Sequence, residues 1–362
     1  MTLVISRHQS FEEIGETAWE ELLGRCAESS IFQTHAWNSC WWSAKQSRGR
    51  TLVLLAARDG ERLVGLAPLY HEERAFHAGR IQFVGHGNSD YLDFLVGATG
   101  GEFGAAGGEV AAALVDVALS IPERWQTFHA ADLPEWSALR RVLETAPGRL
   151  RWRRLPDTPC PGLRRDGDEP VFQRATESKM LRKNSKLLVR AGVVKTRHGR
   201  TATEIQPHLE RFFAMHVQRW SSTPYPSLFL AVENRDFYRR LVERMSPERL
   251  LFTVVLLDEV PVAFHFGFVH AAKLLFYKPT YDVAHSKLSP GSTLLVELFR
   301  WCEENAMQEF DFTRGDEAFK DHFANHLDRN ANYVGYRRRA GLWCDTALDR
   351  ARGMGRKLLR RR

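Results

Sequence analysis

The chain has 362 residues, 44% of them hydrophobic, and a formal net charge of +7. This length suits two domains of ordinary size. No run of about eighteen apolar residues occurs, and an acidic residue appears early near the start, so neither a membrane-spanning nor a secreted protein is expected and a cytoplasmic location is predicted. The segments 179–200 and 346–362 carry net charges of +8 and +6, so the remainder is acidic at −7. A generally basic surface is not implied, and no DNA partner is expected.

The cysteines are odd in number and far apart in the sequence. They are Cys26, Cys40, Cys160, Cys302 and Cys344. None has the paired spacing that metal ligands require, so no metal site is predicted. Reduced thiols are the simpler interpretation.

The first half alternates helical and strand patterns. Apolar residues at helical spacing predict helices over 11–26 and from Thr34, and Trp37 and Trp41 fall on one stripe that favours burial in a core. Two apolar strands within 51–70 meet at Asp59-Gly60, which predicts a hairpin. Further strands are expected at 80–84, 125–130 and 149–155, and helices at 109–120 and 134–145.

Two polar stretches of the first half have open interpretations. Asp90, Tyr91 and Asp93 could line a cleft, or they could be turn formers at strand ends. The glycine-rich stretch 97–108 lacks the register of a dinucleotide-binding loop, and a flexible loop is predicted there.

A domain boundary is predicted at 156–163, where three prolines and a glycine interrupt the apolar pattern. The domains would then be residues 1–160 and 165–345, followed by a basic tail over 346–362. The tail could contact anionic lipid weakly, or it could be a frayed end.

The second half opens with a basic amphipathic helix over 179–191 capped by Ser178. Arg182, Lys183, Lys186 and Arg190 face outward, either as a solvated face or as phosphate contacts. A strand follows at 193–197, then helices at 207–220 and 234–245. Three antiparallel strands fill 250–282, which makes the order of elements that of an α+β fold. The strand–turn–strand units of the two halves also suggest duplication.

Residues 273–323 are the segment on which the functional prediction depends. They read as a strand, a Ser-Pro-Gly turn, a helix, a short strand and an acidic turn. Ser289 is expected to cap the helix and Pro290 to lie in its first turn, while Gly291, Ser292 and Thr293 would offer free backbone N–H groups. Such a helix start is a natural phosphate site.

The stretches YDVAHSKLSPGSTLL and FDFTRGDEAFKDHF resemble the GNAT acyltransferases. More narrowly they are similar to the tandem branch of the cellulose-biosynthesis protein CelD, which is related to the FemABX peptidyltransferases. The SDYLDFLV stretch and the Trp-rich start resemble the partner domain of that branch, so the resemblance covers about residues 10–340. It implies two tandem GNAT-like domains, each with a mixed, mostly antiparallel sheet flanked by helices.

The resemblance also implies a donor and the residues that bind it. Acetyl-CoA or another acyl-CoA would be held as co-substrate by Lys287, Ser289, Gly291, Ser292 and Thr293. The loop departs from the family's Arg/Gln-x-x-Gly-x-Gly/Ala run, because KLSPGS offers a single glycine.

Four side chains are candidates for catalysis. Asp311 projects from the face of its strand opposite Phe310, and it is either a base or a structural carboxylate. Lys320 matches a lysine implicated at the acyl-donor site of FemABX relatives, although an exposed helix lysine is the simpler alternative.

The other two candidates lie on strands before the turn. His265 could be a titrating base or a buried structural histidine. Tyr281 could protonate the departing thiolate, or it could belong to the core.

The predicted function is N-acyl transfer from acyl-CoA to an amine of a sugar, a polysaccharide precursor or a small metabolite, with a role in exopolysaccharide or envelope biosynthesis. One alternative is FemABX-like transfer from aminoacyl-tRNA. The other is a non-catalytic module that binds a partner or a glycan. The sequence says nothing of oligomeric state.

Overall fold

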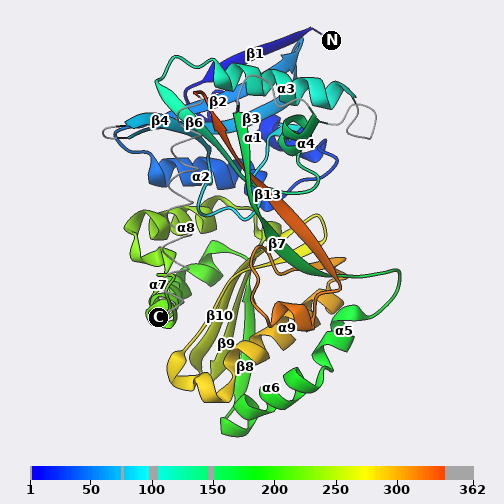
Figure 1. Ribbon diagram of the computed structural model, residues 1–362. Coiled ribbons are helices and arrows are strands. Elements are labelled where there is room, and N and C mark those ends of the chain that lie inside the picture. Colours follow the sequence, from blue (N-terminus) through cyan, green and yellow to red (C-terminus); the bar gives the residue numbers. More distant parts are fainter. Residues whose placement is uncertain (1, 75–76, 98–104, 146–150, 339–362) are drawn as a thin grey trace, which may run out of the picture. The chain divides into compact units, whose positions relative to one another are not determined.

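The computed structural model describes residues 2–74, 77–97, 105–145 and 151–338 (Figure 1). The chain divides into two compact units. Unit 1 comprises Met1–His35, Gln46–Thr158 and Arg329–Arg362, and unit 2 comprises Ala36–Lys45 and Pro159–Asp328. The basic tail lies outside the described residues.

Unit 1 contains a mixed sheet with helices packed against it. Its helices are α1 (Glu16–Gly24), α3 (Ala105–Leu119) and α4 (Ala138–Thr145). Its strands are β1 (Leu3–His8), β2 (Arg50–Asp59), β3 (Arg62–Arg74), β4 (His77–Phe83), β5 (Leu95–Val96) and β6 (Trp125–Leu133), with parts of β7 (Arg151–Arg164) and β13 (His326–Tyr336). The sheet order is β1-β2-β3-β4-β6-β13-β7, and β5 pairs with β3.

The core of unit 1 lies where α3 and α4 cover one face of this sheet. Val110 and Leu114 of α3 pack with Leu55, Ala57 and Phe128 from the strands. The Asp59-Gly60 hairpin forms as predicted between β2 and β3. Helix α1 starts at Glu16 rather than at residue 11, since Gly15 before it has a φ of 80°. This geometry ends any helix that would run through it.

Unit 2 also contains mixed strand pairing, in the order β7-β12-β11-β10-β9-β8. Its strands are β8 (Val194–Gly199), β9 (Leu250–Leu257), β10 (Val260–His270), β11 (Lys273–Tyr281) and β12 (Glu309–Asp311), with the remaining parts of β7 and β13. Its helices are α2 (His35–Lys45), α5 (Val171–Thr176), α6 (Lys179–Ala191), α7 (Ala202–Trp220), α8 (Val232–Arg244) and α9 (Pro290–Glu304).

Helices cover both faces of the unit 2 sheet (Figure 1). On one face, α5, α6 and α9 enclose a core that contains Leu181, Leu274 and Phe299. On the other face, aromatic side chains of α7 and α8 pack on alternate residues of β10; Phe212 lies 5.9 Å from Phe266 between ring centroids. Successive side chains of β10 therefore contribute to the cores on opposite faces of the sheet, with Phe264 and Phe266 on one face and His265 on the other.

The two units repeat one topology. Along the chain, the order strand, two helices, three antiparallel strands, helix and a strand parallel to the third occurs twice, although α2, the second helix of the first repeat, belongs to unit 2. In unit 1 the parallel pair is β4 and β6 on either side of α3, and in unit 2 it is β11 and β12 on either side of α9. The duplication suggested by the strand–turn–strand units is present in the strand pairing.

The division between the two units falls within the predicted boundary at 156–163, between Thr158 and Pro159, but regular structure is not interrupted there, because β7 runs through it. Proline can stay in a strand where its missing N–H is not needed. Here the proline carbonyls make the hydrogen bonds of the strand. The Pro161 carbonyl accepts the N–H of Phe312 at 3.1 Å, and the Pro159 carbonyl accepts the N–H of Gly315 at 2.9 Å.

The units also differ from the expected domain ranges. Helix α2 belongs to unit 2, where Trp37 stacks edge-on against Phe237, Phe268 and Tyr277. Trp37 and Trp41 are buried in a core, as predicted. The glycine-rich stretch is helical from Ala105, and its residues 98–104 lie outside the described part.

Gly65 on β3 marks a close approach of α3 to the sheet. A Cβ at this position would lie 2.5 Å from Cγ1 of Val110, whereas a Cβ at Gly108 within α3 meets nothing within 4 Å. Gly65→Ala should lower the free energy of unfolding by about 1–3 kcal/mol through overpacking. Gly108→Ala, the matched control, should raise it by about 0.5–1 kcal/mol because alanine favours the helix. Urea unfolding measures both, and an unaltered Gly65→Ala variant would contradict the packing described.

Candidate active site

The strands β11 and β12 pair over three residues and then part. Their parallel register joins Lys273 to Glu309 and Leu275 to Asp311, and the described residues show no pairing beyond it. Strand β11 continues to Tyr281 along β10, while the chain after β12 follows β7 through the Phe312 and Gly315 N–H groups. The edge of β11 that faces away from β10 is therefore left without a strand partner.

A bulge lies where the strands part. Between Phe266 and Phe268 of β10, the register jumps from Lys278 to Leu275 of β11, so β11 carries an extra residue. Bulges bend a strand and redirect its side chains. This one turns the last residues of β11 toward the start of α9.

Helix α9 begins beside the end of β11. Ser289 has left-handed dihedrals (φ 54°, ψ 49°) and its side chain makes no cap, so the predicted Ser289 cap was wrong. The N–H groups of Ser292 and Thr293 both reach the Ser289 carbonyl, at 3.0 and 3.4 Å. The Gly291 N–H has no such partner among the described residues, and it is the donor that the first turn leaves for an anion.

Three of the predicted donor-binding side chains have different surroundings near this turn. Lys287 is exposed in the preceding 3₁₀ turn. The Ser292 hydroxyl accepts a hydrogen bond from Nδ2 of Asn184 on α6, at 3.4 Å. The Thr293 side chain is buried, and its hydroxyl has no hydrogen-bond partner in the part of the chain that the structure describes.

Tyr281 lies against this helix start. Its Cδ1 is 3.4 Å from the position that a Cβ on Gly291 would take. On its other side the Arg219 guanidinium stacks 4.3 Å from the ring centroid and donates to the Pro279 carbonyl at 3.0 Å. Arg219 carries no sequence motif, and only the contact of α7 with β11 reveals it.

Asp311 holds the turn that follows β12. Its Oδ1 accepts the N–H of Thr313 at 2.7 Å, and Thr313 has a φ of 57°. Phe310 packs with Phe299 of α9, so the opposite orientation predicted for Asp311 agrees with the strand's alternation. A carboxylate bonded to a backbone N–H two residues on stabilises such a turn.

Lys320 is buried rather than exposed, with 3% of its surface accessible. Its Nζ donates to the carbonyl of Arg314 at 3.0 Å and pairs with Glu317 at 2.8 Å. Gly315, in the same turn, has a φ of 130°, and a Cβ at this position would collide with the Glu317 carboxylate. Lys320 therefore anchors the turn that leaves β12.

His265 lies in the core between β10 and α9. Its ring stacks 5.2 Å from Phe276, and neither ring nitrogen has a well-formed hydrogen bond among the described residues. Burial lowers the pKa of His265 to about 3, so the ring is neutral at physiological pH. Of the two interpretations given to this histidine, its surroundings favour the structural one.

Glu309 was missed by the sequence interpretation, yet it joins the strands where they are still paired. It lies 3.3 Å from Arg164, 3.2 Å from Lys273 and 3.2 Å from His326. Burial alone would raise the pKa of Glu309, but the hydrogen bond from His326 and the two cations lower it to about 2. Only the pairing of β7, β11 and β12 brings these charges together.

The equivalent region of unit 1 is occupied by its own chain. After β4 the segment 85–93 is tied down, with the Leu92 N–H on the Asp132 carbonyl and Asn330 on the Asp90 carbonyl. Asp93 caps α4 by accepting hydrogen bonds from the Ala138 N–H at 2.7 Å and the Ser137 hydroxyl at 2.7 Å. Of the two interpretations given to 90–93, the turn and cap role is the one observed.

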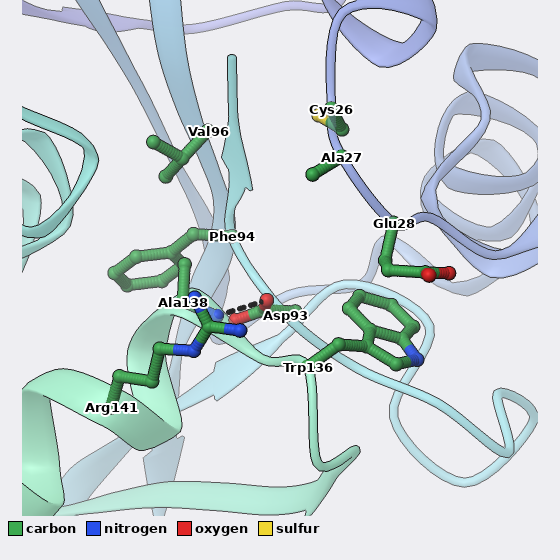
Figure 2. A pocket seen from close by; sticks show the side chains of 9 residues that line it. All are labelled: Cys26, Ala27, Glu28, Asp93, Phe94, Val96, Trp136, Ala138 and Arg141. Atoms are coloured by element: carbon green, nitrogen blue, oxygen red, sulfur yellow. Dashed lines mark hydrogen bonds between the residues drawn. The ribbon is translucent and has the colours of Figure 1, made fainter. Parts of the chain in front are cut away.

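A small cavity of about 40 Å³ lies beside Asp93, between Trp136, Arg141 and Cys26 (Figure 2). It has room for little more than water. No group of three or more metal-ligating side chains occurs in the described part of the chain, and none of its helices is both long and apolar enough to cross a membrane.

The repeated topology, with strands that part beside a helix start, defines a GNAT-like fold. Residues 175–321 match the family model described as an acetyltransferase (GNAT) domain, which covers most of unit 2. No curated protein matches the chain.

Three solved structures share the fold over nearly the whole chain. FemX superposes with a TM-score of 0.65 at 11% identity, covering 95% of this chain and 99% of its own. The C-terminal domain of a putative lysylphosphatidylglycerol synthetase from Agrobacterium fabrum gives 0.55 at 12%, covering 94% and 95%. A tandem GNAT protein from the clavulanic acid biosynthesis pathway gives 0.52 at 12%, covering 93% and 99%. At these identities the likeness concerns the fold.

Asp93 should make the stability of unit 1 depend on pH. Burial raises the pKa of Asp93 to about 6, against the hydrogen bonds from Ser137, Leu139 and Ala138 that lower it. The folded state then holds a proton that the unfolded state releases near pH 4. The contribution of Asp93 to the free energy of unfolding should therefore fall as pH rises from about 4 to about 6.

Asp93→Asn removes this titration and sets an amide against the α4 N–H groups. It should lower stability by about 1–3 kcal/mol at pH 7 and flatten the pH dependence between about 4 and 6. Urea unfolding at several pH values measures both effects, with Asp116→Asn on α3 as control. If the free energy of unfolding of Asp93→Asn depends on pH as that of the unaltered chain does, Asp93 is ionised throughout that range.

Proposed function

We propose that unit 2 is an N-acyltransferase that takes its acyl group from acyl-CoA and passes it to an amine. The observation that carries this proposal is the parting of β11 and β12 beside the start of α9. The match of residues 175–321 to a GNAT domain supports it. The same topology in unit 1 offers no such opening, since its segment 85–93 is bonded in place. We therefore assign the reaction to unit 2.

The donor's pyrophosphate would lie at the start of α9. The Gly291 N–H points there, and the helix dipole favours an anion at this end. Asn184 holds the Ser292 side chain beside it, and Lys287 adds an exposed cation in the preceding turn. The single glycine of KLSPGS is then sufficient, because one free N–H and the dipole do the binding.

The thioester would extend along the unpartnered edge of β11. Backbone N–H groups on such an edge can polarise the carbonyl that the amine attacks. As the tetrahedral intermediate collapses, the carbon–sulfur bond breaks and the thiolate needs a proton. Tyr281 would supply it, with the Arg219 guanidinium stacked on its ring to stabilise the phenolate.

The remaining predicted catalytic residues take supporting roles in this proposal. Asp311 and Lys320 shape the turn that leads the chain away from β11. His265 fills the core behind β11 as a neutral ring. The acceptor, an amine of a sugar, polysaccharide precursor or small metabolite, and the CelD-like role in polysaccharide biosynthesis stay predictions.

A second candidate function is transfer of an aminoacyl group from tRNA. The observation that favours it is the likeness of the whole chain, rather than of unit 2 alone, to FemX. Calorimetric titration of the full chain with acetyl-CoA, coenzyme A and a charged tRNA separates the two. Binding of the coenzyme A species supports the first function. Binding of charged tRNA alone would replace it with the second, and binding of neither would leave a non-catalytic module.

Substitution at Gly291 tests the anion site. Gly291→Asp places a carboxylate at the helix start and should weaken acetyl-CoA binding by about a hundredfold or more. Gly291→Ala is the matched control, because its Cβ makes only ordinary contact with Tyr281. It should bind acetyl-CoA nearly as the unaltered chain does. Equal affinities for all three proteins would place the donor elsewhere.

Tyr281→Phe tests the proton donor. The ring and its stacking on Arg219 remain, so KM for acetyl-CoA should stay unchanged while kcat falls about tenfold to a hundredfold. Coenzyme A release with an amine acceptor measures both constants. Tyr225→Phe, at a tyrosine that is 72% exposed, serves as control. A loss confined to KM would make Tyr281 a binding residue.

A further inference from the structure

A basic groove lies in unit 2 between α6 and α9, next to the end of α5. Its volume is about 460 Å³. Its cations are Arg182, Lys186, Arg190 and Arg300. The hydroxyl-bearing residues Thr176 and Ser185 and the apolar Val189 and Val296 complete the lining.

The cations of the groove lack counter-ions on their own helix. Helix α6 contains no acidic residue, and in the described part of the chain the side chains of Arg182, Lys186 and Arg190 make no hydrogen bond or ion pair. Their spacing of four residues places them about 6 Å apart along the helix, where like charges repel. Arg300 differs, because Glu297 pairs with it at 2.6 Å.

Several exposed cations elsewhere in unit 2 are paired with acidic residues. Lys195 and Arg197 share Glu259, and Arg239 bonds Glu210 at 2.7 Å. An ordinary solvated face would show the same mixture of signs. The groove instead concentrates positive charge where an anion can neutralise it.

We infer that this groove binds a small organic molecule that carries two or more phosphate groups. Its volume lies within the range of about 300–1,000 Å³ typical of small-molecule sites. The cations match phosphate charge, and the apolar wall of the exposed Val189 and the buried Val296 suits an organic body.

The lining argues against larger partners. It contains no aromatic side chain on which a nucleic-acid base could stack. The apolar face of α6, with Leu181 and Leu188, is buried in the protein and is not free to enter a lipid surface.

The groove is separate from the proposed donor site. Val296 and Arg300 follow Ser292 by about 6 and 12 Å along α9. A ligand here would therefore add to the acyl donor rather than replace it.

Titration of the full chain with inorganic tripolyphosphate and with a sugar bisphosphate, at constant ionic strength, tests the inference. Both should bind, with inorganic phosphate much weaker. The double variant Lys186→Gln/Arg190→Gln should lose about tenfold or more in affinity, equal to about 1.4 kcal/mol. Lys183→Gln, an exposed cation of the same helix outside the groove, should bind as the unaltered chain does.

Several results would overturn the inference. They are an absence of binding to both polyanions, a loss of affinity in Lys183→Gln equal to that in the double variant, and displacement of tripolyphosphate by coenzyme A. Tighter binding of an RNA oligonucleotide or of phosphatidylglycerol vesicles than of either polyanion, lost in the double variant, would assign the groove to that partner instead. Acetyl-CoA binding that stays unchanged in the double variant separates this site from the proposed donor site.

Discussion

The short parallel contact between β11 and β12 is the constraint on which the rest of unit 2 depends. Three residue pairs hold the strands together, and Glu309 joins Arg164, Lys273 and His326 at this closed end. Beyond it, β12 follows β7, whose proline carbonyls accept the N–H groups of Phe312 and Gly315. The strands part because each has a better partner on its other side. The bulge in β11 and the start of α9 then meet beside the unpartnered edge.

Comparison of the two units shows what makes this opening a site. Both repeat the same order of strands and helices, and both have a parallel strand pair around a helix. In unit 2, a single 3₁₀ turn (Val283–Leu288) separates β11 from α9, so the helix start lies at the strand end. In unit 1 the chain between β4 and α3 is longer, and Asp90 and Leu92 are bonded within it. One fold thus yields an open strand edge in one copy and a packed segment in the other.

Local signals in the sequence predicted the elements better than the site. Ser178 caps α6 as expected, and the Asp59-Gly60 hairpin forms; both depend on residues that are neighbours in the sequence. The burial of Trp37 follows from the apolar stripe of one helix. The continuity of β7 through Pro161 could not be predicted, because it depends on which carbonyls a distant strand needs. The left-handed backbone conformation of Ser289 likewise depends on the preceding 3₁₀ turn rather than on the Ser-Pro-Gly sequence. Contacts between distant segments, such as Arg219 on Tyr281, leave no pattern in the sequence.

Three of the predicted catalytic residues have structural contacts in this fold. Lys320, Asp311 and His265 carry the groups that catalysis uses, yet each has a structural partner or a core position that accounts for it. A buried ionisable group is retained when its loss would leave backbone groups unpaired, and the turn after β12 contains several such groups. The groups left available are a backbone N–H at Gly291, a strand edge and the Tyr281 hydroxyl. The proposed site would therefore depend on backbone geometry more than on the identity of its side chains.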